Sequence, residues 1–197
     1  MPQKFDPSYR LENVPLYEAI YGKNLISLGG LDAIKNMFSD LNIKGLTALD
    51  LGFGLGGVAF YLAKSHAMKV TGIEVHPWMA NYAQAHTPKD IAHLLKFEVY
   101  NEAGKMPFKA ASFDIVYSKG VLNHVRNKEI LFDKVNALLK PTGLFVIADW
   151  IHPQATQDPA GFLVNETQGS YQQGRVQKRS AIPIFSHDLL STSKGVL

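Results

Sequence analysis

The chain has 197 residues, of which 46% are hydrophobic, 11% aromatic and 19% charged, and its formal net charge is +3. This composition predicts one globular domain with a sizeable core, and it excludes a disordered chain and a collagen-like repeat. The absence of cysteine excludes a disulfide framework, a thiolate nucleophile and a zinc site with cysteine ligands.

Charge and hydropathy also restrict the partners and the compartment. Lys and Arg are scattered through the chain, whereas a strong nucleic-acid footprint shows a basic stripe, so no nucleic-acid partner is expected. The first residues lack the apolar core of a signal peptide, and no apolar run reaches the roughly 18 residues of a membrane helix. We therefore expect a cytoplasmic protein without stable membrane insertion.

The order of the expected elements predicts the fold class. An N-terminal arm, residues 1–45, carries a helix at 28–41, where apolar residues recur at helical spacing. Strands are expected at 47–51, 69–75, 94–100, 113–117 and 144–150, and helices at 58–66, 77–85 and 128–139. The sequence Lys-Pro-Thr-Gly at 140–143 is a breaker between the last helix and the last strand. Strands that alternate with helices predict right-handed βαβ crossovers and a parallel sheet, hence an α/β fold.

A glycine-rich turn follows the first expected strand. Gly52, Gly54 and Gly57 satisfy the pattern G-x-G-x-x-G, and Glu74 lies on the next strand, where an acid that binds a ribose would lie. Glycines let the backbone approach a ligand closely, and the following helix offers unpaired N–H groups and partial positive charge. As a bare pattern, the turn allows a dinucleotide-binding interpretation.

Three other features favour a different nucleotide cofactor. Asp50 lies two residues before the first glycine, where a carboxylate suits a ligand with a positive amino group and opposes a pyrophosphate. A long arm precedes the first strand, and the segments 112–117 (SFDIVY) and 138–144 (LLKPTGL) follow in order and spacing. Together these motifs resemble the class I S-adenosylmethionine-dependent methyltransferases over residues 46–150, and the resemblance implies that this range forms a doubly wound, Rossmann-like core. The alternative is a glycine turn that serves only close packing of a helix on a strand.

That resemblance implies roles for the residues of the turn. Gly52, Gly54 and Gly56 would approach the methionyl part of S-adenosylmethionine, and S-adenosylhomocysteine would be the product. Asp50 would anchor the turn or face the amino group of the cofactor.

The resemblance also implies contacts with the nucleoside part of the cofactor. Glu74 would accept hydrogen bonds from both ribose hydroxyls, and Val75 would pack against the adenine. Asn101 takes the place of an adenine-binding acid when positions are counted from the third strand, and Glu102 does so when they are counted back from 106–108. Either side chain has an acceptor oxygen for the adenine amine.

The arm carries a closer resemblance. Residues 17–31 (YEAIYGKNLISLGGL) resemble the phosphoethanolamine N-methyltransferases, which make phosphocholine by three N-methylations, and the likeness extends over about residues 9–150. It implies that Tyr17, Ile26 and Ser27 close over the cofactor. It also implies a catalytic pair, Tyr9 and His124, that covers the site and assists deprotonation, because a protonated amine has no lone pair with which to attack a methyl group. The other histidines show no metal-ligand spacing and are expected at the surface: His66, His76, His86, His93, His152 and His187.

Two positions depart from the phosphoethanolamine methyltransferase pattern. The family has an Asp after the basic residue of the fourth strand; here that basic residue is Lys119, which the resemblance places at the cofactor, and Gly120 follows it. The family's aromatic hydroxyl after the fifth strand is replaced by Trp150, whose ring face can hold a methylated ammonium as substrate. These departures predict a pocket that prefers a different amine, or one that is already methylated.

The tail, residues 151–197, is expected to form part of the acceptor side. If that segment is helical, Arg175, Lys178 and Arg179 share one face of the helix, and Arg179 is the candidate for binding a phosphate; a solvated basic face is the alternative. A full methyltransferase sheet has seven strands, but here no sixth and seventh strands are expected, only a short helix at 186–190. The sequence thus predicts a C-terminally shortened chain whose fifth strand has an open edge, suited to a homodimer.

Several functions are compatible with these patterns. The first is methyl transfer to a small molecule, above all N-methylation of phosphoethanolamine or a related amine. The alternatives are a methyltransferase for a quinone, sterol or other lipid, a nicotinamide-dependent oxidoreductase, and a cofactor-binding protein without activity.

Overall fold

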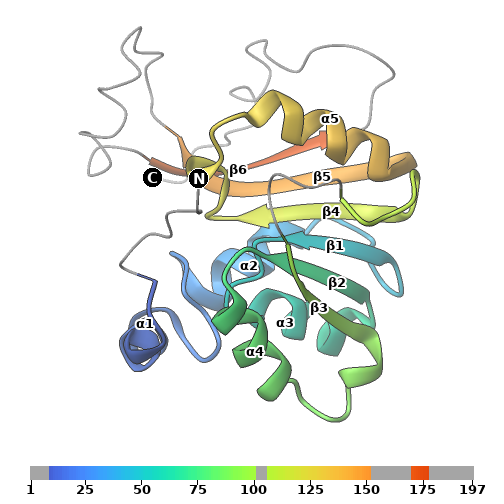
Figure 1. The fold of residues 1–197 in the computed structure, drawn as a ribbon. Coiled ribbons are helices and arrows are strands. Elements are labelled where there is room, and N and C mark those ends of the chain that lie inside the picture. Colours follow the sequence, from blue (N-terminus) through green and yellow to red (C-terminus); the bar gives the residue numbers. More distant parts are fainter. Residues whose placement is uncertain (1–8, 101–105, 152–169, 178–197) are drawn as a thin grey trace, which may run out of the picture.

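The computed structural model describes residues 9–100, 106–151 and 170–177, with side chains described for 9–100 and 106–149. A six-stranded sheet in the order β3-β2-β1-β4-β5-β6 forms its centre (Figure 1). The strands are β1 (Thr47–Leu51), β2 (Lys69–Glu74), β3 (Leu95–Val99), β4 (Phe113–Lys119), β5 (Leu139–Ile151) and β6 (Ser170–Gln177). Strands β1 to β5 run parallel to one another, which confirms the predicted parallel sheet.

Helices cover both faces of the sheet, as a doubly wound fold requires. The helices α2 (Gly30–Phe38), α3 (Gly57–His66) and α4 (Pro77–Ala85) pack on one face, and α5 (Lys128–Leu138) packs on the other (Figure 1). Side chains alternate across β1, so that Ala48 packs with α2 to α4 while Leu49 and Leu51 pack with α5. The same alternation turns Asp50 toward the side of α2 to α4. Within the described part of the chain, no helix is long and apolar enough to cross a membrane.

The arm contains more structure than the sequence predicts. It forms the 3-10 turn η1 (Leu11–Asn13), then α1 (Val14–Tyr21) and α2, of which only α2 was expected, with wider bounds. A proline in the first turn of α1 suits its start, and Gly22, with φ of +102°, ends it. Two further 3-10 turns lie in loops of the core, η2 (Ala92–Leu94) and η3 (Leu122–His124).

The edge beside β5 differs from the prediction. Strand β6 pairs antiparallel with β5 from Leu144↔Gln177 to Ile151↔Ser170, so the expected open edge and the absence of a sixth strand are wrong. The helix through Arg175 is also wrong, because that residue lies in β6. A ladder is made by backbone N–H and C=O groups, so a segment rich in Gln can pair without the apolar alternation that announces a strand. The predicted homodimer required an unpaired edge of β5, and β6 occupies that edge. Residues 178–197, with the helix expected at 186–190, lie outside the described residues.

The breaker at residues 140–143 lies within β5 and not, as the sequence predicted, between α5 and β5. Helix α5 ends at Leu138, and β5 begins at Leu139 rather than at residue 144. The register shifts between the pairs Phe113↔Leu139 and Ile115↔Leu144, which takes residues 140–143 out of the regular ladder. Such an irregularity accommodates proline and glycine within a strand.

Candidate functional site

The glycine turn between β1 and α3 needs its glycines for two reasons. Gly52, Gly54 and Gly56 have φ of +73°, +55° and +89°, a backbone conformation that other residues adopt only with strain. The space for a side chain is limited as well. A Cβ on Gly52 would lie 2.5 Å from the side chain of Val121, and a Cβ on Gly57 would lie 2.4 Å from the carbonyl oxygen of Asn24. The turn is therefore bare backbone at the carboxyl end of β1.

Asp50 lies beside this turn, and its carboxyl group is buried. The side chain is 2% exposed, and the hydroxyl of Tyr117 on β4 donates to its Oδ2 at 2.8 Å. Burial raises the pKa of Asp50 to about 8, the hydrogen bond from Tyr117 opposes the rise, and the nearby carboxylate of Glu74 adds to it. Asp50 is thus protonated at neutral pH, and a cation placed beside it would restore its negative charge.

Glu74 ends β2 and holds the turn in place. Its Oε2 accepts from the N–H of Gly54 at 3.1 Å, and its Oε1 accepts from the N–H groups of Val75 and His76 at 2.8 and 3.1 Å. A carboxylate has about four acceptor positions, so Glu74 can still take a hydroxyl donor. Val75, the expected neighbour of the adenine, is half-buried at this edge.

Residues 24–28 of the arm cross the turn as a strap, which we call the arm strap. The carbonyl of Asn24 accepts from the N–H of Gly57 at 3.0 Å. Ile26 lies over Gly54, its Cδ1 being 3.6 Å from the position of a Cβ there. Of the two strap residues expected at the cofactor, Ile26 thus lies next to the glycine turn, whereas Ser27 contacts Lys119 and Gly120.

A buried lysine fixes the far end of the arm strap. Lys119 is 6% exposed, and its Nζ donates to the Oγ of Ser27 and to the carbonyl of Leu28, both at 2.7 Å. Burial lowers the pKa of Lys119 to about 8, against the opposing attraction of Asp149. The cofactor contact expected of Lys119 remains a prediction, while the structure shows this residue bound to the arm.

A carboxylate of α1 fixes the near end. The Oε1 of Glu18 accepts from the N–H of Asn24 at 2.9 Å and from the hydroxyl of Tyr82 on α4 at 3.0 Å, and its Oε2 accepts from Lys23 at 3.0 Å. Burial favours a higher pKa of Glu18, but these hydrogen bonds outweigh it and lower the pKa. Sequence reasoning missed this anchor; Tyr17, the neighbour it singled out, is half-buried on α1.

The predicted catalytic pair is brought together from opposite parts of the chain. The hydroxyl of Tyr9 and the Nε2 of His124 are 3.4 Å apart, and their rings meet edge to face at 5.8 Å between centroids. His124 lies in η3, and its side chain is exposed. Asp149 caps the start of η3, because the Oδ2 of Asp149 accepts from the N–H groups of residues 121 and 122 at 2.9 and 2.6 Å.

One histidine expected at the surface is part of this cluster. His76 is only 9% exposed, and its ring lies 5.8 Å from that of Tyr9, so the prediction of a surface position is wrong. Its place two residues after β2 was an available signal, since ligands gather at the carboxyl ends of parallel strands. His86 and His93 are exposed, as predicted.

Other expected site residues are described in part or not at all. Gly120 has φ of +70°, and a Cβ there would lie 3.4 Å from Ser27, so the arm borders the position of the missing carboxylate. Trp150 is in β5, but its side chain lies outside the description. Asn101, Glu102 and Arg179 lie outside the described residues altogether.

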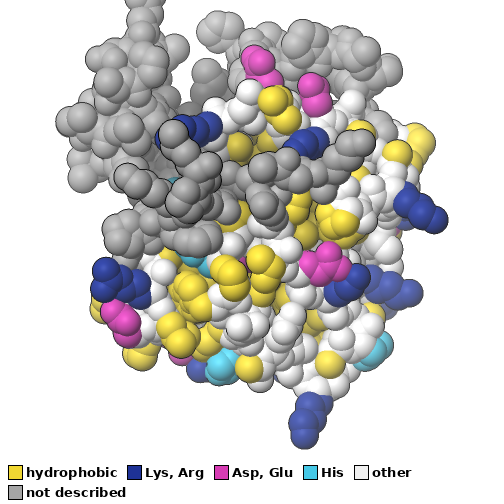
Figure 2. All heavy atoms as spheres, viewed as in Figure 1, with side chains coloured by type: hydrophobic (Ala, Val, Ile, Leu, Met, Phe, Trp, Pro, Cys, Tyr) yellow, Lys and Arg dark blue, Asp and Glu magenta, His cyan; other side chains and the backbone are white. Residues whose placement is uncertain are grey.

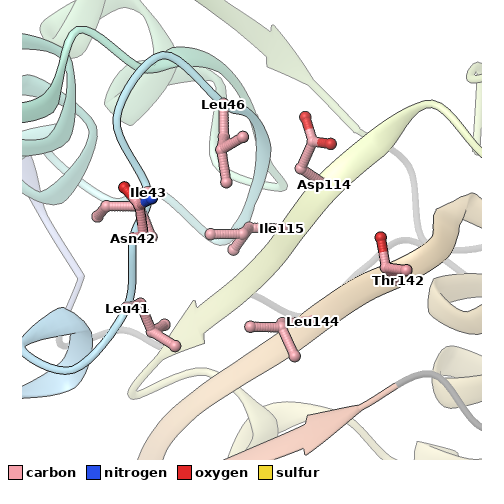
Figure 3. A pocket seen from close by; sticks show the side chains of 8 residues that line it. All are labelled: Leu41, Asn42, Ile43, Leu46, Asp114, Ile115, Thr142 and Leu144. Atoms are coloured by element: carbon pink, nitrogen blue, oxygen red, sulfur yellow. The ribbon is translucent and has the colours of Figure 1, made fainter.

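A hollow lies at the end of the sheet opposite the glycine turn. It has a volume of about 230 Å³, and Figure 3 shows the loop 41–46 on one side of it and β4 and β5 on the other. The acid in its wall, Asp114, already accepts from Lys140 at 2.8 and 2.9 Å and from the Thr47 hydroxyl at 2.6 Å. Ligands of open α/β sheets bind at the carboxyl ends of the strands, which places the candidate site at the glycine turn instead. On the face drawn in Figure 2, the described Lys and Arg side chains are dispersed over several elements.

The family described as methyltransferase domain matches residues 49–147, from β1 to β5. The chain belongs to this methyltransferase family. The match includes the glycine turn, and it favours the methyltransferase interpretation of that turn over the dinucleotide one. In the described part of the chain, no group of three or more His, Cys, Asp or Glu side chains is placed to hold a metal ion.

Curated relatives of this methyltransferase are similar over most of the chain. Phosphoethanolamine N-methyltransferase 3 of Arabidopsis thaliana is 31% identical over 152 residues, 77% of this chain and 31% of that protein. The phosphoethanolamine N-methyltransferase of Plasmodium falciparum is 34% identical over 145 residues, 72% of this chain and 53% of that protein. A 2-methyl-6-phytyl-1,4-hydroquinone methyltransferase of Synechocystis is 34% identical over 134 residues, 68% of this chain and 39% of that protein. The chain therefore spans about a third to a half of the length of these relatives.

Solved structures confirm the predicted class I methyltransferase fold. Phosphoethanolamine N-methyltransferase 2 of Haemonchus contortus, in complex with S-adenosylmethionine, has a TM-score of 0.72 at 26% identity, covering 82% of this chain and 38% of that one. The same protein with phosphomonomethylethanolamine and S-adenosylhomocysteine has a TM-score of 0.69 at 26% identity, covering 81% and 38%.

Proposed function

We propose that this methyltransferase binds S-adenosylmethionine and methylates the nitrogen of a small amine, with phosphoethanolamine or one of its methylated forms as the acceptor. The observation that carries the proposal is the contact between Tyr9 and His124, whose side chains are 3.4 Å apart. The likeness to phosphoethanolamine N-methyltransferases supports the choice of amine.

The residues at the turn fit the proposed cofactor. Gly52 and Gly54 present backbone without side chains, and the uncharged Asp50 beside them gains a negative charge next to a positive α-amino group. Glu74 keeps acceptor capacity for a ribose hydroxyl. Bound there, the cofactor supplies a methyl group activated by a sulfonium. The arm, residues 1–45, would close over the core, residues 46–150, through the arm strap, and the tail, residues 151–197, would complete the acceptor side.

The catalytic pair supplies what an ammonium acceptor lacks. Such an acceptor must lose a proton before its nitrogen has a lone pair to attack the methyl group, and a histidine serves as a base near neutral pH. We propose that His124 accepts this proton. The hydroxyl of Tyr9 lies 3.4 Å from Nε2 and would orient the ring for this step.

The test is an acceptor screen with methyl-labelled S-adenosylmethionine. The panel contains phosphoethanolamine, its mono- and dimethylated forms, ethanolamine and a hydroquinone. We expect transfer to at least one of the phosphorylated amines, a loss of about 10²-fold or more in His124→Ala, and no change in His93→Ala, which alters an exposed histidine. Unchanged activity in His124→Ala would show that the base is another group.

A second candidate acceptor is a hydroquinone. The relative from Synechocystis favours it, as does Gly120, which offers no carboxylate to an ammonium. A phenolic hydroxyl also needs a base before it or its ring is methylated, so His124 is compatible with both acceptors. Label on the hydroquinone alone would establish this candidate, whereas no label on any acceptor would indicate a cofactor-binding protein without activity on these substrates.

A further inference from the structure

We infer that His76 is a positioning residue that holds the ring of Tyr9 against His124. This inference rests on the proposed function, in which those two residues form the catalytic pair. It assigns a role to a histidine at the start of α4 that no sequence motif predicts.

The backbone of His76 is fixed by the core. Its N–H donates to Oε1 of Glu74 at 3.1 Å, and its carbonyl accepts from the N–H groups of Met79 and Ala80 at 3.1 and 3.3 Å. The side chain is 9% exposed, so the imidazole has little freedom to move. His76 therefore offers a rigid ring at the carboxyl end of β2.

Tyr9 lies outside the helices and strands, before η1, so neither a helix nor a strand ladder holds it in place. Its ring has an imidazole on two sides: His76 at 5.8 Å between centroids and 55° between planes, and His124 at 5.8 Å and 76°. Tilted and edge-to-face arrangements within about 4.5–7 Å are the favourable geometries of aromatic rings. The three rings thus form a row from the core to the proposed base.

The row also connects the cofactor side of the site to the catalytic side. The carboxylate of Glu74 binds the N–H of Gly54 in the glycine turn and the N–H of His76. The turn that would carry the cofactor and the ring that supports Tyr9 are therefore attached to one side chain. A role of His76 that passes through Tyr9 must disappear when the hydroxyl of Tyr9 is removed, which makes the inference testable.

The test compares His76→Ala, His76→Phe, Tyr9→Phe and the double variants in the full chain. We expect His76→Ala to lower kcat about 2- to 10-fold, as the loss of one aromatic contact would, with the dissociation constant of S-adenosylhomocysteine unchanged by calorimetry. His76→Phe keeps a ring and should restore kcat to within about twofold. In the Tyr9→Phe background, His76→Ala should have no further effect on kcat. The inference is overturned if the effect on kcat persists in that background, or if His76→Ala acts only by weakening the binding of S-adenosylhomocysteine.

A second readout does not depend on activity. Ring resonances of His124, assigned in NMR spectra of protein labelled with ¹⁵N-histidine, should shift in His76→Ala and in Tyr9→Phe but not in His93→Ala. Circular dichroism checks that each variant is folded. If the resonances shift and no acceptor is methylated, the inference stands and the proposed function fails; if they do not shift, the inference fails whatever the activity.

Discussion

Substituting Asp50 by Asn should remove a pH dependence of stability that burial imposes on this protein. The pKa of Asp50 is about 8 in the folded chain and near 3.8 in an unfolded one, so the folded state binds the extra proton between those values. Stability must then fall as pH rises from about 4 to about 8, by about 1.4 kcal/mol per pH unit, and the whole interval is on the order of 5 kcal/mol. A loss of that size is comparable with the total stability of many domains, about 5–15 kcal/mol.

Urea unfolding at pH 5, 6 and 7 measures this dependence. Asn has nearly the same shape, its amide oxygen can accept from Tyr117, and it does not titrate. Between pH 5 and pH 7 the wild-type protein should therefore lose about 3 kcal/mol more than Asp50→Asn, while other titrating groups cancel in the difference. Asp90→Asn, at an exposed position, is the control that should keep the wild-type slope. Parallel pH profiles for the wild-type protein and Asp50→Asn would refute a protonated Asp50.

The same protonation predicts how the cofactor binds. A positive amino group beside Asp50 lowers the pKa of its carboxyl, so binding of S-adenosylhomocysteine at pH 7 should release up to one proton. Calorimetry in two buffers of different ionisation enthalpy counts the protons, and Asp50→Asn should release none. Equal release by both proteins would assign the proton to another group.

Three further substitutions test the arm and the far end of the sheet. Gly57→Ala adds a Cβ 2.4 Å from the carbonyl oxygen of Asn24, so it should displace the arm strap and weaken S-adenosylhomocysteine binding about tenfold, as measured by calorimetry. Lys119→Met removes the hydrogen bond to Ser27 and should speed proteolysis of the arm. Because burial lowers the pKa of Lys119 to about 8, the wild-type protein should gain stability between about pH 8 and pH 10, and Lys119→Met should abolish this gain. Burial favours a higher pKa of Asp114, but its hydrogen bonds outweigh burial and lower the pKa. Asp114→Asn should therefore reduce the free energy of unfolding by about 1–2 kcal/mol at pH 7, with methyl transfer unchanged. In urea unfolding, the difference between the variant and the wild-type protein should close as pH falls below about 4.

The parallel core could be predicted from the sequence because its signals are local and periodic. Apolar runs mark β1, β2 and β4, and the glycines of the turn occur where a positive φ and close contacts require them. Tyr9 and His124 could be paired only through a resemblance, because they are 115 residues apart and no local pattern connects them.

The missed features depend on contacts between distant residues. Glu18 holds the arm through Tyr82, 64 residues away, and its own surroundings in the sequence give no sign of this. A lone histidine such as His76 carries no periodicity, so its burial could not be read from its sequence neighbours, although its place after β2 indicates the ligand side of the sheet. Strand β6 was missed for a related reason, since backbone hydrogen bonds to β5 define it.

Thermal unfolding with S-adenosylhomocysteine and with NAD tests the central claim most directly. A ligand at about 100 times its dissociation constant stabilises a folded protein by about 2.7 kcal/mol, which corresponds to a rise in Tm of about 5–10 °C for a chain of this size. The structure predicts such a rise with S-adenosylhomocysteine, a smaller one in Gly57→Ala, and none with NAD. A rise with NAD and none with S-adenosylhomocysteine would contradict the assignment of the glycine turn to a methyl donor.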